Sequence, residues 1–202
     1  MTRLVCLTSV LALTAGAATA QEMNFNRIAS FPVAANLPEG TDQATETSAE
    51  IMVATPDGQM LVYSDSPLGG IGMVDISDPA APAPAGTVML DGEPTSVAVS
   101  GGTAFVSVNS SESFTAPSGH LIAISIDSRE ETARCDLGGQ PDAIATAPDG
   151  SFLAVAIENE RDEDLGEGRV PQMPAGEVVM FDIAGGRSEE HTSELQSLLI
   201  IS

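Results

Sequence analysis

Acidic and amide side chains recur at the ends of short apolar runs in this sequence, and their oxygen atoms are ligands for a hard metal ion. Calcium takes about six to eight such oxygens, and magnesium takes fewer. We predict that calcium is held by some of these residues, supplied by several loops: Glu50, Asp65, Glu93, Asn109, Asp142, Glu158, Asn159 and Glu160. A calcium ion held in this way could activate water, so metal-dependent hydrolysis is the chemistry to consider.

The simpler interpretation of these acids is solvation. The chain is acidic throughout, and a charge run such as residues 158–164 is most often a solvated surface. Arg161 is the cation inside this run. It is a candidate substrate-binding residue for a phosphate or carboxylate, and the alternative is that it forms ion pairs with its acidic neighbours.

Other catalytic motifs are missing from the sequence. It contains no G-x-S-x-G elbow, and an S-x-x-K site is excluded because the chain has no lysine. Zinc spacings and glycine-rich phosphate loops are missing too. We expect His120 to be structural, and we expect Cys135 to pack on an outer strand because it has no CxxC partner. The catalytic residues therefore stay unknown at this stage.

An internal repeat must position these side chains. A Pro-Asp-Gly turn occurs at residues 56–58 and again at 148–150, and a Gly-Gly turn lies between them at 101–102. Each turn joins two apolar alternations, which is typical of a β-hairpin, and two further short strands follow. Four strands in units of about 46 residues predict β-propeller blades. An antiparallel sandwich is the alternative, but it leaves the recurring turn unexplained.

We therefore predict an all-β fold, with about three four-stranded blades of a larger, truncated propeller. In a propeller the connections that carry the acids emerge at one end of the sheets. Residues 27–31 are expected to form the outer strand of the last blade in a complete propeller. Since about four to eight blades close a propeller, residues 21–186 expressed alone are expected to aggregate or unfold in part.

The amino-acid composition limits which classes of molecule this protein can bind. Of 202 residues, 29 are Asp or Glu and 7 are arginine, so the net charge is -22. Nucleic acid is excluded as a partner because its binding depends on clustered cations. The hydrophobic content of 43% predicts a folded chain rather than a disordered one.

The two ends of the sequence have a different character. Residues 1–20 show Arg3, an apolar run and a small-residue site, which predicts a secretory signal peptide cleaved after Ala20. We expect a periplasmic or secreted protein without a membrane span after cleavage. Residues 187–202 include RSEEHTSELQS, which looks like a translated sequencing adapter; the alternative is a genuine amphipathic helix. The predicted domains are thus 1–20, a partial propeller at 21–186, and an artefactual tail at 187–202.

Residues 25–182 also resemble a known family. The runs GEPTSVAVSGG, APSGHL and GGQPDAIATAPDGSFLAVAIENERDED are similar to the bacterial exported β-propellers described as esterase-like phytase-family proteins, sometimes labelled alkaline phosphatases. The resemblance implies a secreted or periplasmic propeller and a calcium-dependent phosphoester hydrolase, in which calcium binds phosphate and activates water.

Two hypotheses for the function follow. One is a hydrolase that acts on phosphate esters of a small-molecule substrate. The other is a non-catalytic binding propeller that uses the same acidic loops to hold an envelope protein or other ligand. Chemistry alone leaves the two even, and the resemblance favours the hydrolase.

Overall fold

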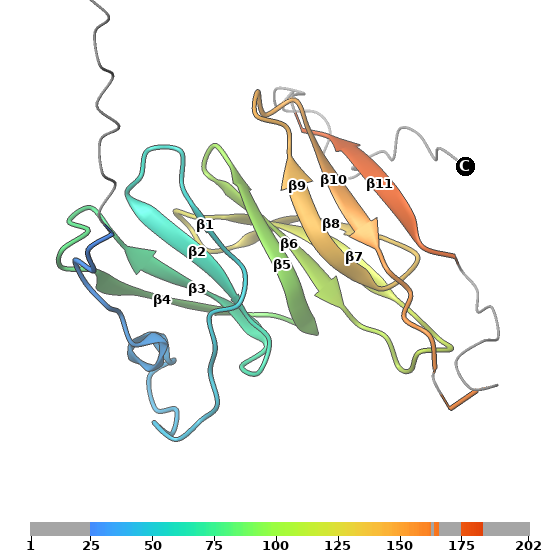
Figure 1. The fold of residues 1–202 in the computed structure, drawn as a ribbon, viewed down its shortest axis with the longest axis horizontal. Coiled ribbons are helices and arrows are strands. Elements are labelled where there is room, and N and C mark those ends of the chain that lie inside the picture. Colours follow the sequence, from blue (N-terminus) through green and yellow to red (C-terminus); the bar gives the residue numbers. More distant parts are fainter. Residues whose placement is uncertain (1–24, 163, 166–174, 184–202) are drawn as a thin grey trace, which may run out of the picture.

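The computed structural model describes residues 25–162, 164–165 and 175–183, which form three antiparallel sheets arranged side by side (Figure 1). The first sheet has the order β1-β2-β3-β4, the second β5-β6-β7-β8 and the third β11-β10-β9. The elements are η1 (Val33–Asn36), β1 (Met52–Ala54), β2 (Met60–Asp65), β3 (Gly70–Asp75), β4 (Ala83–Met89), β5 (Glu93–Ser100), β6 (Thr103–Asn109), β7 (Gly119–Ser125), β8 (Glu131–Asp136), β9 (Pro141–Thr146), β10 (Phe152–Ile157) and β11 (Glu177–Asp182).

Tight turns build the hairpin at the start of each sheet. Gly58, Gly101 and Gly150 adopt positive φ angles of 70°, 57° and 70° in the turns after β1, β5 and β9. Glycine adopts this conformation without the steric cost that a Cβ imposes. The turn chemistry seen in the sequence therefore sets the hairpin register, in which Ser100 pairs with Thr103 and Ala54 with Leu61.

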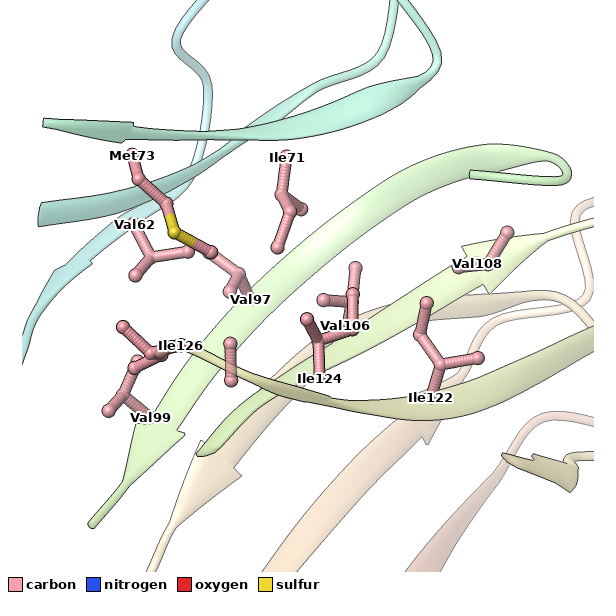
Figure 2. Packing of buried hydrophobic residues seen from close by; sticks show 11 residues of the cluster. Val62, Ile71, Met73, Val97, Val99, Val106, Val108, Ile122, Ile124 and Ile126 are labelled. Atoms are coloured by element: carbon pink, nitrogen blue, oxygen red, sulfur yellow. The ribbon is translucent and has the colours of Figure 1, made fainter. Parts of the chain in front are cut away.

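Successive residues of a strand point to opposite faces, so each sheet can pack on both sides. In β6, Val106 and Val108 belong to a hydrophobic cluster shared with the first sheet, whereas Phe105 belongs to a cluster shared with the third. Figure 2 shows the first cluster, in which Ile71 and Met73 of the first sheet face the valines and isoleucines of the second. The core therefore consists of two layers between neighbouring sheets.

The contacts between the first strands of the sheets show that the sheets are arranged as propeller blades. β5 contacts both β1 and β9, so the first strands of the three sheets lie next to one another and the fourth strands lie outside. The all-β propeller prediction is confirmed, and each sheet is called a blade below. The third blade shows three strands within the described residues. The predicted signal peptide and C-terminal tail lie outside the described residues.

The N-terminal segment covers one face of the first blade instead of forming a strand. Residues 27–31 are not a strand in this structure, and the side chain of Ile28 is exposed. Their place as the outer strand of the last blade in a complete propeller stays a prediction. Asn36, at the end of η1, is 3% exposed. Its amide nitrogen donates to Met73 O (2.7 Å) and Tyr63 Oη (3.1 Å), and its amide oxygen accepts from Gly86 N (3.0 Å). The face is therefore closed by a polar contact with matched donors and acceptors.

Candidate functional site

Two kinds of connection meet at one end of the blades, which we call the acidic end. Asp65 closes β2 opposite Gly70, and Asn109 closes β6 opposite both Glu93 and Gly119. The acidic end therefore comprises the connections after the second and fourth strands and the segment that enters β1 (residues 46–51, 66–69, 90–92, 110–118, 137–140 and 158–162). All eight predicted metal ligands lie at this end or on the adjoining strand termini.

Asp65 has a buried carboxylate that accepts three hydrogen bonds from its own blade. Asp65 is only 1% exposed. The donors are the Thr47 hydroxyl, Ser48 N (2.9 Å) and Leu68 N (3.2 Å). A buried charge is tolerated when such donors replace water. Asp65 therefore fixes the segment that enters the first blade.

Asn159 holds loop segments of the third blade in a similar way, through its side-chain amide. Its side-chain oxygen accepts from Gln140 N (2.9 Å), and its amide nitrogen donates to Ala175 O (3.1 Å). Its φ of 51° is a left-handed conformation that asparagine tolerates better than most residues. Asn109, in the second blade, accepts from Ser111 N (3.0 Å) within its own loop. These two amides and Asp65 hold loops in place, a role that the sequence prediction did not assign to them.

Glu50 and Glu93 lie near the junction between the first and second blades. The Ser66 hydroxyl contacts the Glu50 carboxylate and donates to Pro94 O (2.8 Å). Glu93 is exposed at the start of β5. Ser66 thus links the loops of two blades at the acidic end, whereas the carboxylate of Glu93 faces solvent.

Asp142, Glu158 and Glu160 form a carboxylate group on the third blade. Desolvation raises the pKa of Glu158 above its usual value, and the neighbouring charges of Asp142 and Glu160 raise it further. Gln140 orders this group, because its side chain donates to Glu160 Oε2 (3.0 Å) and accepts from Glu160 N (3.3 Å). All three acids are exposed, so a cation from solvent can reach the place where the charges of Asp142 and Glu160 act on Glu158.

Replacing Glu158 with glutamine is expected to raise the melting temperature at pH 7. Since folding raises the pKa of Glu158, the folded state binds a proton more tightly than the unfolded state, and stability falls as pH rises from the ordinary value of 4.5 through the raised one. The charged form is therefore destabilising at pH 7. Well below pH 4.5 Glu158 is neutral in both the folded and the unfolded state, and the difference between the two proteins should disappear. Thermal melts across this range test it, with Glu130→Gln as control; a lower melting temperature for Glu158→Gln at pH 7 would contradict it.

The other candidates divide between surface and packing roles. Arg161 is exposed in the acidic run, and its role in substrate binding stays a prediction. Cys135 is half-buried on β8 and packs against the second hydrophobic cluster, as expected. Desolvation raises the pKa of its thiol, which keeps it protonated and a poor nucleophile at neutral pH.

A group of three side chains on β7 and β8, those of Arg134, Glu131 and His120, was missed by the sequence reasoning. Arg134 donates to both carboxylate oxygens of Glu131 (2.9 and 2.8 Å), and its Nη1 lies 3.1 Å from His120 Nε2. Residues three apart on a regular strand point to opposite faces, but a register shift lies between Ala123 and Ile124, opposite this pair. The shift brings Glu131 and Arg134 together, and nothing in the alternating pattern reveals it.

His120 belongs to this group. Desolvation lowers the pKa of the imidazole, and the Arg134 guanidinium lowers it further, so the ring is neutral at pH 7 and accepts at Nε2.

Within residues 25–162, 164–165 and 175–183, no group of three His, Cys, Asp or Glu lies close enough to hold a metal ion. The predicted ligands, several of which are already hydrogen-bonded within their loops, do not form a ready calcium cage. Calcium binding stays a prediction.

Comparison with solved structures agrees with the fold. The chain is similar to hydrazine synthase of Kuenenia stuttgartiensis, with a TM-score of 0.50 and 18% identity over 67% of this chain and 34% of that one. It is also similar to a luciferin-regenerating enzyme, with a TM-score of 0.48 and 16% identity over 65% of this chain and 43% of that one. The chain thus spans less than half the length of either protein, and at these identities the likeness to hydrazine synthase concerns the fold alone.

Comparison with families is more specific. No curated protein matches the chain. In the part of the chain that the structure describes, no helix has the length and apolar character needed to span a membrane. The family model of the choice-of-anchor I domain matches residues 50–198, which include all the described blades. The chain therefore belongs to the choice-of-anchor I domain family.

Proposed function

We propose that this chain is part of an exported, non-catalytic binding propeller whose acidic end holds a basic segment of an envelope protein. The family's description as a choice-of-anchor domain supports an exported or surface-attached protein, and so does the signal peptide predicted at residues 1–20. The observation that carries the binding proposal is the exposed position of Glu158 near two further exposed carboxylates, Asp142 and Glu160, whose charges act on it.

Hydrogen bonds between residues 140 and 159–160 of the third blade support this proposal. Gln140 and Asn159 hold the two acidic segments together through hydrogen bonds to backbone and side chains. A preorganised group of like charges gains favourable Coulomb energy when lysine or arginine side chains approach, and it loses little conformational entropy. The net charge of -22 adds a long-range attraction for basic partners, which accelerates their association at low salt.

The test uses an octalysine peptide and isothermal titration calorimetry on the full chain. Glu158→Gln combined with Glu160→Gln should weaken binding by about tenfold at low ionic strength, because two close charge contacts are lost. The matched control is Asp127→Asn with Glu130→Gln, which removes the same charge from the turn between β7 and β8 at the opposite end. Equal weakening by both pairs would show attraction to overall charge only, and would overturn the proposal.

A calcium-dependent phosphoester hydrolase is the second candidate. It is supported by the resemblance to phytase-like propellers. Titration of the full chain with calcium chloride, followed by release of phosphate from p-nitrophenyl phosphate with and without chelator, separates the two functions. Turnover that chelation abolishes would favour the hydrolase, and its absence with any divalent metal would exclude it.

A further inference from the structure

The outer edge of the third blade differs from the corresponding edge of the other two blades. In the first and second blades a fourth strand covers the third strand, with β4 paired to β3 and β8 paired to β7. β11 occupies the place of the third strand in the third blade. Among the described residues it pairs with β10 alone, at the end of the row of sheets (Figure 1). Such an edge presents backbone N–H and C=O groups that can pair with another strand.

The burial of β11 also differs from that of its counterparts. Residues 70–74 of β3 and 121–124 of β7 are buried. In β11 Phe181 is buried, Met180 is half-buried, and Val178 is 58% exposed. β11 therefore has the apolar composition of a covered strand, but its edge is uncovered in the part of the chain that the structure describes.

The ladder between β10 and β11 determines which backbone groups face this edge. Ile183 N donates to Ser151 O (3.1 Å), one residue beyond the paired strands. Backbone groups alternate between the two sides of a strand, so those of Val179 also point to β10. The N–H and C=O groups of Val178 and Met180 therefore point to the open edge.

Carboxylates at both ends of β11 select the kind of strand that fits. Glu177 is exposed at the start of β11 and pairs with Ile157, which precedes Glu158 of the acidic end. Asp182 is exposed at the other end of β11. A second copy of the chain would bring the same acids against these ends, and each copy has a net charge of -22, so charge disfavours it. A strand with basic residues at its ends and apolar residues between them is complementary.

We propose that an extended segment of the partner, basic at its ends and apolar between them, pairs antiparallel with β11 as the fourth strand of the third blade. This inference rests on the function proposed above, because it specifies how the basic segment binds beside the acidic end. Backbone hydrogen bonds to Val178 and Met180 supply affinity, and a lysine or arginine opposite Glu177 supplies selectivity. Apolar residues of the segment lie opposite Val178 and Met180 as cross-strand neighbours.

The test uses the full chain and the acetylated, amidated peptide Lys-Thr-Val-Thr-Val-Lys, whose valines lie opposite Val178 and Met180. Calorimetric titration at low ionic strength measures its affinity. N-methylation of both valines removes the N–H groups that face β11, and it should weaken binding by about tenfold or more. N-methylation of both threonines adds the same methyl groups and keeps the same charge, but it removes N–H groups on the far side, so binding should be kept.

A substitution at residue 178 tests the same contact from the side of the protein. Val178→Pro removes the N–H that faces the edge and keeps the hydrogen bonds to β10, and proline is tolerated at such a place in an edge strand. It should weaken binding of the unmethylated peptide by about tenfold, whereas Val178→Ala keeps the N–H and should weaken it by less than about threefold. If Val178→Pro unfolds, the two methylated peptides still decide the question on the wild type.

Hydrogen exchange provides a readout that attraction between charges does not produce. The amides of Val178 and Met180 should exchange quickly in the free chain and more slowly in the complex with the unmethylated peptide. Slow exchange in the free chain would mean that the chain itself or a second copy covers the edge, and it would overturn the proposal. Binding without slower exchange at these two amides would overturn it as well.

The failure of strand addition can be told apart from the failure of the proposed function. If octalysine binds through Glu158 and Glu160 but the two methylated peptides bind equally, strand addition is overturned and the proposed function stands. If neither octalysine nor the unmethylated peptide binds, both are overturned.

Discussion

Replacing Asp65 with alanine is expected to lower the free energy of unfolding by about 3 kcal/mol or more, because buried donors lose their acceptor. The Asp65 carboxylate accepts from the Thr47 hydroxyl, Ser48 N and Leu68 N, and the residue is 1% exposed. Water cannot replace these contacts without opening the loops. Urea unfolding followed by circular dichroism measures the change.

Two matched variants make the Asp65 prediction specific. Asp65→Asn keeps the shape and one acceptor oxygen, so it should lose less stability than Asp65→Ala. Asp75→Ala removes an exposed carboxylate that accepts from Ser77 N (2.9 Å), and it should cost less than about 1 kcal/mol. If Asp65→Ala and Asp75→Ala unfolded at the same urea concentration, the buried carboxylate would not hold the first blade as argued.

Replacing Leu121 with alanine is expected to destabilise the junction between the second and third blades by about 3–4 kcal/mol. Leu121 is 0% exposed and belongs to the same hydrophobic cluster as Leu153 and Phe181 of the third blade. Its truncation removes transfer free energy and leaves a cavity between two sheets. Urea unfolding again measures the loss, and Val178→Ala, at a residue that is 58% exposed, should change it by less than about 0.5 kcal/mol.

Hydrogen exchange locates the effect of Leu121→Ala. The amides of β10 should exchange faster, whereas those of β2 and β3 should change little, because they pack in the other cluster. Uniform acceleration across all three blades would mean that the two hydrophobic layers unfold as one unit, contrary to the prediction.

The blades could be predicted because their signals are local. Turns with Asp57-Gly58 and Asp149-Gly150 and the alternation in β6 and β7 depend on residues close in sequence. The grouping of acids at one end follows from strand direction alone. The exact roles of Asp65 and Asn159 could not be predicted, since a metal ligand and a hydrogen-bond acceptor for backbone amides have the same residue types.

The contacts of Arg134 and Arg129 could not be predicted from the sequence for a different reason. The pairing of Glu131 with Arg134 depends on a shift in strand register, and the path of Arg129 depends on the space above Gly86 in another blade. The covering of the first blade by Asn36 likewise requires contacts between segments that are distant in sequence, such as the bond from Gly86 N to Asn36. A single sequence carries no local signal for such pairs.

The polar closure at Asn36 has a consequence for the order of folding. Strands pair in chain order within each blade, and each hydrophobic layer joins consecutive blades. Because the face covered by η1 is sealed by residues that precede the first blade in the chain, that blade can form without waiting for later ones. Each later blade can then pack on a blade that has already folded. When the chain emerges N-terminus first, folding in this order keeps the exposed apolar face to that of one blade at a time.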